Sequence, residues 1–148
     1  MPSHRESRTL PYTADVMYAI VADVEKYPQF LPWVTSLRIT KPLSDRVFES
    51  EMRVGFAGIY EGFISKVTLD PDAHTIDVVK VEGGPFRQLE NHWRFIPRGE
   101  GCRVEFAIAF EFRSPLLNMV AGKAFEHVML KMADAFEARA RQLSGGIA

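Results

Sequence analysis

The sequence predicts an α+β fold in which a strongly curved antiparallel sheet of six to seven strands wraps around one long C-terminal helix. Between about residues 34 and 112, apolar residues recur at every second position, which indicates half-buried strands. After Ser114 the apolar spacing changes to three and four and continues to about Leu143, which indicates one long amphipathic helix. A sheet with one apolar face and a helix with one apolar stripe pack as two layers, and a sheet of this size twists strongly enough to curl around the helix.

The segment before the sheet predicts one strand and short helices. Residues 8–12 form a short candidate strand. Thr13 is a plausible N-cap, and the apolar spacing after it predicts a helix to about Glu25. Pro28 and Pro32 then interrupt an apolar segment that cannot continue as a long helix.

The sheet itself is expected to be a series of hairpins. Turn-forming residues separate the alternating segments at 43–45, 55–58, 70–72, 83–85 and 97–101. The predicted strands are 34–40, 48–56, 60–69, 75–81, 89–95 and 104–112. The last of these alternates most regularly.

The final helix is expected to begin after the cap pair Ser114-Pro115 and to be closed by Gly145 and Gly146. Its predicted apolar stripe consists of Leu117, Val120, Ala121, Ala124, Phe125, Val128, Met132 and Phe136. No linker, repeat or low-complexity tract interrupts the chain, so residues 1–148 are expected to form a single domain.

Composition excludes several classes of protein. Hydrophobic residues make up 47% and charged residues 25% of the 148 residues, as in a folded globular domain. The 18 basic and 19 acidic residues are interspersed and give a net charge of -1, so no nucleic-acid partner is expected. The longest apolar runs are only a few residues, whereas a membrane-spanning helix needs roughly 20.

The cysteine count and the N-terminal residues suggest a reducing compartment. Cys102 is the single cysteine, which excludes an internal disulfide and a cysteine-based metal cluster. The first ten residues contain no apolar stretch, so no signal peptide is expected.

Aromatic and methionine side chains predict either a packed core or an apolar ligand cavity between sheet and helix. Many of the 11 Phe, 4 Tyr and 2 Trp residues fall on the inward face of the predicted strands. Apolar residues also occupy expected connections at 30–33, 56–59 and 85–86, where they either plug the structure or form the rim of a ligand site. The candidate ligand-binding residues are Phe30, Leu31, Pro32, Trp33, Met52, Val54, Phe56, Phe63, Phe86, Asn91, Trp93, Phe106, Phe110, Phe125, Met129 and Met132.

Three polar residues share the inward face. Ser50, Ser65 and Asn91 have the same parity as their apolar neighbours, and buried polar groups need partners. They could bond to one another, to water or to a ligand carbonyl, and Asn91 is the most suitable donor among them. Arg94 and Lys66 fall at positions of their strands that are expected to face outward.

No catalytic, metal or cofactor site is predicted. The four histidines, His4, His74, His92 and His127, do not have the spacing of metal ligands, and no nucleophile elbow or phosphate-binding glycine loop is present. His92 is expected on the outer face of its strand, and His127 is expected to be structural or exposed.

Several motifs resemble the coenzyme Q-binding family of the START-like (polyketide cyclase) superfamily. The main one is the run Val21–Trp33, with the sequence VADVEKYPQFLPW. Others are residues 54–56 (VGF), 84–86 (GPF) followed by Leu89, 93–95 (WRF) and 110–114 (FEFRS). The resemblance spans essentially the whole chain and implies the helix-grip fold.

The resemblance further implies a non-catalytic carrier or chaperone that binds ubiquinone or a similar isoprenoid lipid and supports respiratory electron transport. Ubiquinone would then be a bound ligand, with transient contact at a membrane surface. The same family includes ribosome-association toxins, so a protein that blocks ribosomal subunit association is an alternative, and a polyketide cyclase or aromatase is a third. The expected location is the cytoplasm, peripheral to a bacterial inner membrane, or the mitochondrial matrix side if a transit segment has been removed.

Overall fold

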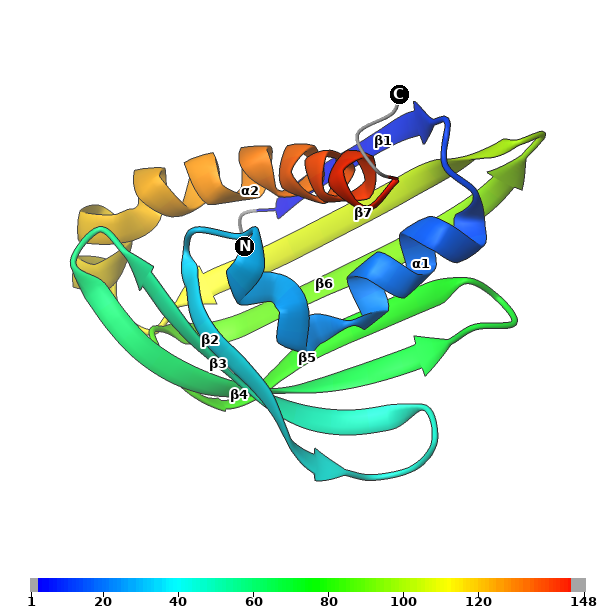
Figure 1. The fold of residues 1–148 in the computed structure, drawn as a ribbon. Coiled ribbons are helices and arrows are strands. Elements are labelled where there is room, and N and C mark those ends of the chain that lie inside the picture. Colours follow the sequence, from blue (N-terminus) through cyan, green and yellow to red (C-terminus); the bar gives the residue numbers. More distant parts are fainter. Residues whose placement is uncertain (1–2, 145–148) are drawn as a thin grey trace.

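The computed structural model describes residues 3–144 and contains seven strands, two α-helices and one 3₁₀-helix (Figure 1). In chain order the elements are β1 (Ser3–Leu10), α1 (Ala14–Ala22), η1 (Val24–Gln29), β2 (Val34–Pro42), β3 (Val47–Phe56), β4 (Ile59–Asp70), β5 (Thr75–Gly83), β6 (Phe86–Arg98), β7 (Gly101–Phe112) and α2 (Pro115–Leu143).

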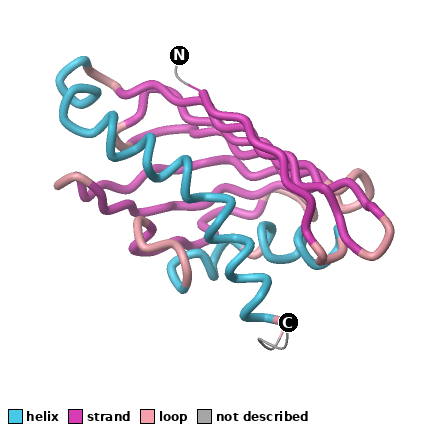
Figure 2. Tube along the Cα trace, turned by 90° about the horizontal axis from the view of Figure 1, so that it is seen from above, coloured by secondary structure: helices cyan, strands magenta, loops and turns pink. Residues whose placement is uncertain are grey.

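All seven strands form one antiparallel sheet in the order β1-β7-β6-β5-β4-β3-β2. The sheet curves, and α2 runs obliquely across its concave side, as the view from above shows (Figure 2). The α1 helix and η1 lie on the same side, beside the C-terminal half of α2 (Figure 1). This is the helix-grip arrangement, so the predicted fold class is confirmed.

The first strand differs from the predicted residues 8–12. It covers Ser3–Leu10 and pairs with β7 from Ser3 opposite Ala109 to Leu10 opposite Cys102. Nearly all of its residues are polar, so hydrophobic alternation could not indicate a strand there. Its pairing with β7 and its contacts with α2 determine its extent instead.

The first helix is shorter than predicted. It ends at Ala22 rather than near Glu25, with Asp23 as its C-cap, and η1 follows with Pro28 inside it. The predicted cap is confirmed, since the Thr13 hydroxyl accepts a hydrogen bond from the Val16 amide at 3.2 Å.

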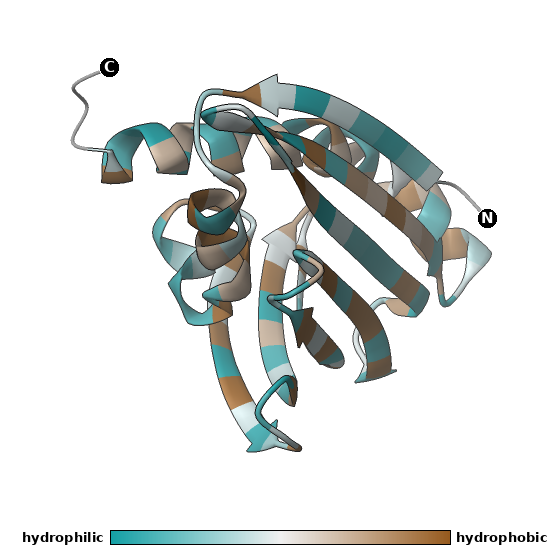
Figure 3. Ribbon diagram, turned by 90° about the vertical axis from the view of Figure 1, so that its right-hand side faces the viewer, coloured by the Kyte–Doolittle hydropathy of each residue, from teal (hydrophilic) through white to brown (hydrophobic). Residues whose placement is uncertain are grey.

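Strand alternation places the core on the concave side of the sheet. Along β7 every second residue is buried, and Figure 3 shows the corresponding bands of apolar and polar residues along the strands. The β6 strand begins at Phe86, earlier than predicted, after a turn at Gly83 and Gly84. A Cβ at Gly84 would lie 2.7 Å from the Phe63 Cβ, and Gly84 has φ +78°, so this close turn requires glycine.

The α2 helix begins as predicted, with the Ser114 hydroxyl accepting from the Leu117 amide at 3.1 Å. The assignment of Val120 to its apolar stripe is wrong, because that side chain is 58% exposed. The predicted closing residues Gly145 and Gly146 lie outside the described residues. Among residues 3–144 no helix combines the length and the hydropathy needed to cross a bilayer.

Candidate functional site

The concave side of the sheet carries apolar side chains that are only partly covered. Met52 on β3 and Leu89 on β6 are half-buried and pack against the buried core. Phe30 and Trp33, after η1, and Met132 on α2 are half-buried as well. An apolar surface that is enclosed by the fold but incompletely packed is the kind of surface that binds apolar ligands.

At the N-terminal end of α2 the interior is filled by six aromatic rings, here called the phenylalanine cluster. Phe125 of α2 is its centre, with ring centroids 4.5 Å from Phe110, 4.9 Å from Phe86 and 5.7 Å from Phe56. The full set is Phe56, Phe63, Phe86, Phe110, Phe112 and Phe125. These rings join α2 to strands from both halves of the sheet, and a ligand that reached this end would have to displace some of them.

The C-terminal half of α2 is attached by a second aromatic group. Phe136 lies with its ring centroid 5.0 Å from Trp93, 5.2 Å from Tyr27 and 5.2 Å from Phe30. The Arg139 guanidinium donates to the Gln29 side chain at 2.8 Å. This half therefore packs on both η1 and β6.

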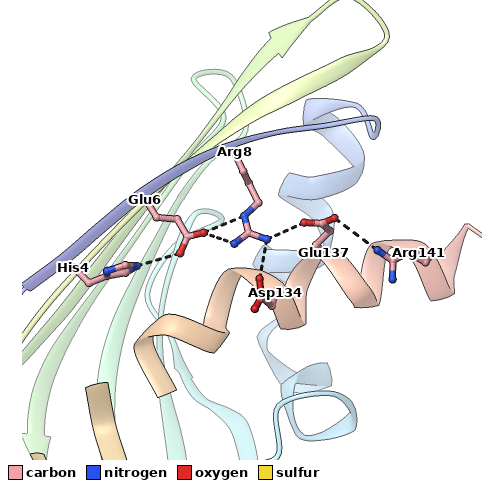
Figure 4. A network of polar contacts seen from close by, with 6 residues as sticks. All are labelled: His4, Glu6, Arg8, Asp134, Glu137 and Arg141. Carbon is pink, nitrogen blue, oxygen red and sulfur yellow. Dashed lines mark hydrogen bonds and ion pairs between the residues drawn. The ribbon is translucent and has the colours of Figure 1, made fainter. Parts of the chain in front are cut away.

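A polar network adds a further attachment between α2 and β1 (Figure 4). The Arg8 guanidinium contacts Asp134 at 3.0 Å and Glu137 at 2.8 Å, and it also pairs with Glu6 on its own strand. Burial acts to raise the pKa of Glu6, but hydrogen bonds from Arg8 and His4 outweigh it, so the net pKa is lowered. Glu6 is therefore held in its charged form in the folded protein.

The N-terminal half of α2 has no comparable attachment. Among residues 3–144, no ion pair involves a residue of α2 before Asp134. Its outward side chains include Leu116, Met119 and Val120, which are 65%, 76% and 58% exposed. The helix is thus fixed at its C-terminal end and held at the other end by apolar contacts only.

The sixteen predicted ligand-binding residues divide into three groups. Half-buried residues are Phe30, Trp33, Met52, Phe56, Asn91 and Met132. Fully buried residues are Leu31, Val54, Phe63, Phe86, Trp93, Phe106, Phe110, Phe125 and Met129. Pro32 is exposed. Of the two alternatives for the apolar connections, plug or rim, burial favours the plug at Leu31, Ile59 and Phe86, which are at most 7% exposed.

Two hollows on the surface lie apart from these half-buried side chains. A hollow of about 530 Å³ lies on the outer face of β1, β7, β6 and β5, lined among others by Arg5, His92 and Arg94. Another of about 440 Å³ lies where β7 meets the start of α2, beside Phe110 and Phe112. Neither of these two hollows is lined by Phe30, Trp33 or the other half-buried side chains of the concave side.

The histidine that could have suggested catalysis lies on the outer face, as predicted. His92 Nδ1 is 2.6 Å from Asp77 Oδ1, and both side chains are about half exposed. His127 is also exposed, on α2. Among residues 3–144 there is no group of three or more His, Cys, Asp or Glu side chains placed to hold a metal ion.

The predicted inward polar residues do face the concave side. Ser50 and Ser65 are 3% and 6% exposed and lie opposite each other in the β3–β4 ladder. Asn91 is half-buried, and its side-chain carbonyl accepts from Trp93 Nε1 at 3.2 Å. One inward polar residue was not predicted. Lys80 of β5 lies two and four residues after Val78 and Ile76 and therefore faces the same side of the sheet. The alternation of these three residues was visible in the sequence.

The comparisons with known proteins agree with this geometry. Residues 10–137 match the family described as polyketide cyclase / dehydrase and lipid transport. The chain is 34% identical to the mitochondrial coenzyme Q-binding protein COQ10 homolog B of Xenopus laevis, over 96% of this chain and 59% of that protein's length. It is 33% identical to the ribosome association toxin RatA of Escherichia coli, over 97% of this chain and 89% of the toxin.

Solved structures show the same fold. The 18 kDa protein CC1736 of Caulobacter crescentus is 42% identical with a TM-score of 0.76, over 98% of this chain and 99% of that one. The ZhuI aromatase/cyclase of Streptomyces sp. R1128 has a TM-score of 0.81 over 96% of this chain and 95% of that one, but at 18% identity it bears on the fold alone. With its helix-grip architecture and a family match over residues 10–137, this chain belongs to the polyketide cyclase / dehydrase and lipid transport family.

Proposed function

We propose that the protein binds ubiquinone or a similar isoprenoid lipid between the concave face of the sheet and α2, and carries it without catalysing a reaction. The observation that supports this most is the set of half-buried apolar side chains on that face, with Trp33, Met52 and Met132 among them. The 34% identity to a coenzyme Q-binding protein supports the choice of ligand class.

The mechanism would be thermodynamic. An isoprenoid tail in water exposes apolar area at a cost of about 25 cal/mol per Å². Transfer of the tail onto the concave face lowers this cost, because the same area then contacts methionine and aromatic side chains. Methionine suits tails of different shape, since its side chain is flexible and polarisable.

Entry is proposed to occur at the N-terminal half of α2. That half is held by Phe125 in the phenylalanine cluster, whereas the other half is held by the Arg8 network and by Phe136. Movement of α2 about its anchored end would separate Phe125 from Phe56 of the neighbouring β3. The carrier would thereby open toward the exposed start of α2.

The exposed start of α2 is proposed to touch the membrane from which the lipid is collected. Leu116, Met119 and Val120 are exposed there, and Lys123 follows one turn later. Apolar side chains beside a cation suit an interface with anionic lipid. The protein would then be peripheral to a membrane.

The test of this membrane contact is sedimentation with vesicles that contain anionic phospholipid, which should carry the protein into the pellet. The double variant L116E/M119E should abolish this co-sedimentation. Ala138→Glu, on the same helix, should not change it.

The test of the carrier function is titration with decylubiquinone, followed by quenching of tryptophan fluorescence. Trp33 and Trp93 both lie on the ligand side, so saturable quenching is expected. Met132→Glu, which places a charge on the concave side, should weaken binding by about tenfold or more, because burying an unpaired charge costs well over 1.4 kcal/mol. Leu130→Glu, on the exposed side of the same helix, is the matched control. An absence of saturable quenching, or equal losses in both variants, would contradict the proposal.

A second candidate function is ribosome binding. The likeness to the Escherichia coli toxin covers 89% of that protein, so it extends over nearly the whole of both chains. Overproduction of this chain should then deplete assembled ribosomes in sedimentation profiles. Unchanged profiles together with decylubiquinone binding would exclude this candidate in favour of the carrier.

A further inference from the structure

Three adjacent strands place a row of polar residues on the otherwise apolar concave face. Ser50 of β3 is the register partner of Ser65 of β4, and Ser65 is the partner of Lys80 of β5. Opposite residues of an antiparallel ladder have side chains on the same face, with Cβ atoms about 4.5–5.5 Å apart. The three side chains therefore project side by side from the floor of the concave face.

No side chain among the described residues forms an ion pair with Lys80, the charged member of this row. None of the ion pairs among residues 3–144 involves Lys80, although that side chain is only partly exposed. In the same part of the chain neither serine hydroxyl takes part in a hydrogen bond with protein. An ammonium and two hydroxyls on an otherwise apolar surface are therefore available to bind a polar group of a ligand.

The sheet also parts at this point. The β5–β6 ladder ends at the pair Val79 and Glu90, although both strands continue beyond it, to Gly83 in β5 and back to Phe86 in β6. Lys80 is the first residue of β5 past the last pair. The next residue of β6 in the same register is Leu89, which is half-buried and packs against the core. A head group bound beside Lys80 would leave its tail in contact with that side chain.

We propose that Ser50, Ser65 and Lys80 form the head-group subsite of the carrier, and that this subsite selects lipids whose head group carries an acidic oxygen, a carboxylate or an ionised phenol. The Lys80 ammonium pairs with the charged oxygen, and the serine hydroxyls donate to it or to a neighbouring oxygen. This inference rests on the proposed lipid-carrier function and narrows its ligand within the isoprenoid lipids, because it prefers an acidic head group to the neutral head group of ubiquinone.

The test compares two probes with the same tail and ring, one with a charged and one with a neutral head group: a geranylgeranyl-substituted benzoic acid and its methyl ester. The native protein should bind the acid at least about tenfold more tightly than the ester. A charge-assisted hydrogen bond contributes more than about 1.4 kcal/mol, which is the free energy that corresponds to a tenfold change in Kd. Lys80→Met should bind both probes equally, with the affinity for the ester unchanged. Lys66→Met, on the exposed outer face of neighbouring β4, should keep the preference.

The outcomes separate this inference from the carrier function. If the native protein binds acid and ester equally, or if Lys80→Met keeps the preference, the subsite is overturned and the carrier remains. If neither probe nor decylubiquinone binds, both are overturned. A thermal unfolding midpoint for Lys80→Met within a few degrees of the native value would show that the variant is folded.

Discussion

Replacing Phe125 by alanine tests whether the phenylalanine cluster is both a packed core and the part of the interior that a ligand enters. Phe125 is 6% exposed and contacts four other rings of the cluster, those of Phe56, Phe86, Phe110 and Phe112. A buried phenylalanine removes roughly 150–250 Å² from water. Truncating it is expected to cost about 3–5 kcal/mol of unfolding free energy, the range observed when a buried phenylalanine becomes alanine.

Chemical denaturation and thermal unfolding measure this loss. For a chain of this length, each kcal/mol lowers the midpoint by about 2–4 °C, so a fall of about 6–20 °C is expected. Phe95→Ala is the matched control, because Phe95 is 1% exposed but packs against Trp93 and Tyr18, outside the cluster. It should lose a similar amount of stability.

Ligand addition separates the two variants. Phe125→Ala leaves apolar space beside the proposed entry, so decylubiquinone should stabilise it more than it stabilises the native protein. At a concentration one hundred times Kd the gain is about 2.7 kcal/mol. Phe95→Ala should respond as the native protein does. The reasoning is refuted if Phe125→Ala costs less than about 1 kcal/mol, or if the ligand stabilises both variants alike.

Three further predictions concern the polar network and the cysteine. Arg8→Met should lower the unfolding free energy by about 1–3 kcal/mol, between the values for exposed and buried ion pairs, because it removes the cation that joins the carboxylates of β1 and α2. Urea denaturation measures this loss, and an unchanged midpoint would contradict it. The pKa of Glu6 in the folded state lies below its ordinary value of 4.5. The contribution of this carboxylate to the free energy of unfolding is therefore present above pH 4.5 and is lost as the pH falls through the folded-state pKa. Glu6→Gln should flatten the decline of stability at acid pH, and an identical decline in the variant would argue against it. Cys102 is 0% exposed, and burial raises the pKa of its thiol. Iodoacetamide at pH 8 should therefore label this cysteine only after denaturation. Rapid labelling of the native protein would be inconsistent with the burial of the thiol.

The elements that the sequence predicted well are those with a strong local signal. The caps at Thr13 and Ser114 and the alternation in β7 follow from hydrogen-bonding groups and hydrophobic period, which act within a few residues. The polar β1 strand carries no such signal, because its pairing with β7 joins residues about a hundred positions apart.

The sequence predicted which face of the sheet carries the candidate site, but not which residues of that face are buried. Parity placed Ser50 and Ser65 correctly on the concave side, but it could not distinguish the buried Phe86 from the half-buried Met52. That difference depends on where α2 crosses the sheet. Val120 fits a helical stripe by spacing and is nevertheless 58% exposed, because spacing alone does not show which side of a helix the rest of the fold covers.

The most direct test of the carrier function is organic-solvent extraction of freshly purified protein, followed by mass spectrometry of the extract. If the concave face holds an isoprenoid lipid, about one such molecule should be recovered per chain, and the Met132→Glu variant should yield much less. An empty extract from a protein that also fails to take up added decylubiquinone would contradict the account and favour ribosome binding.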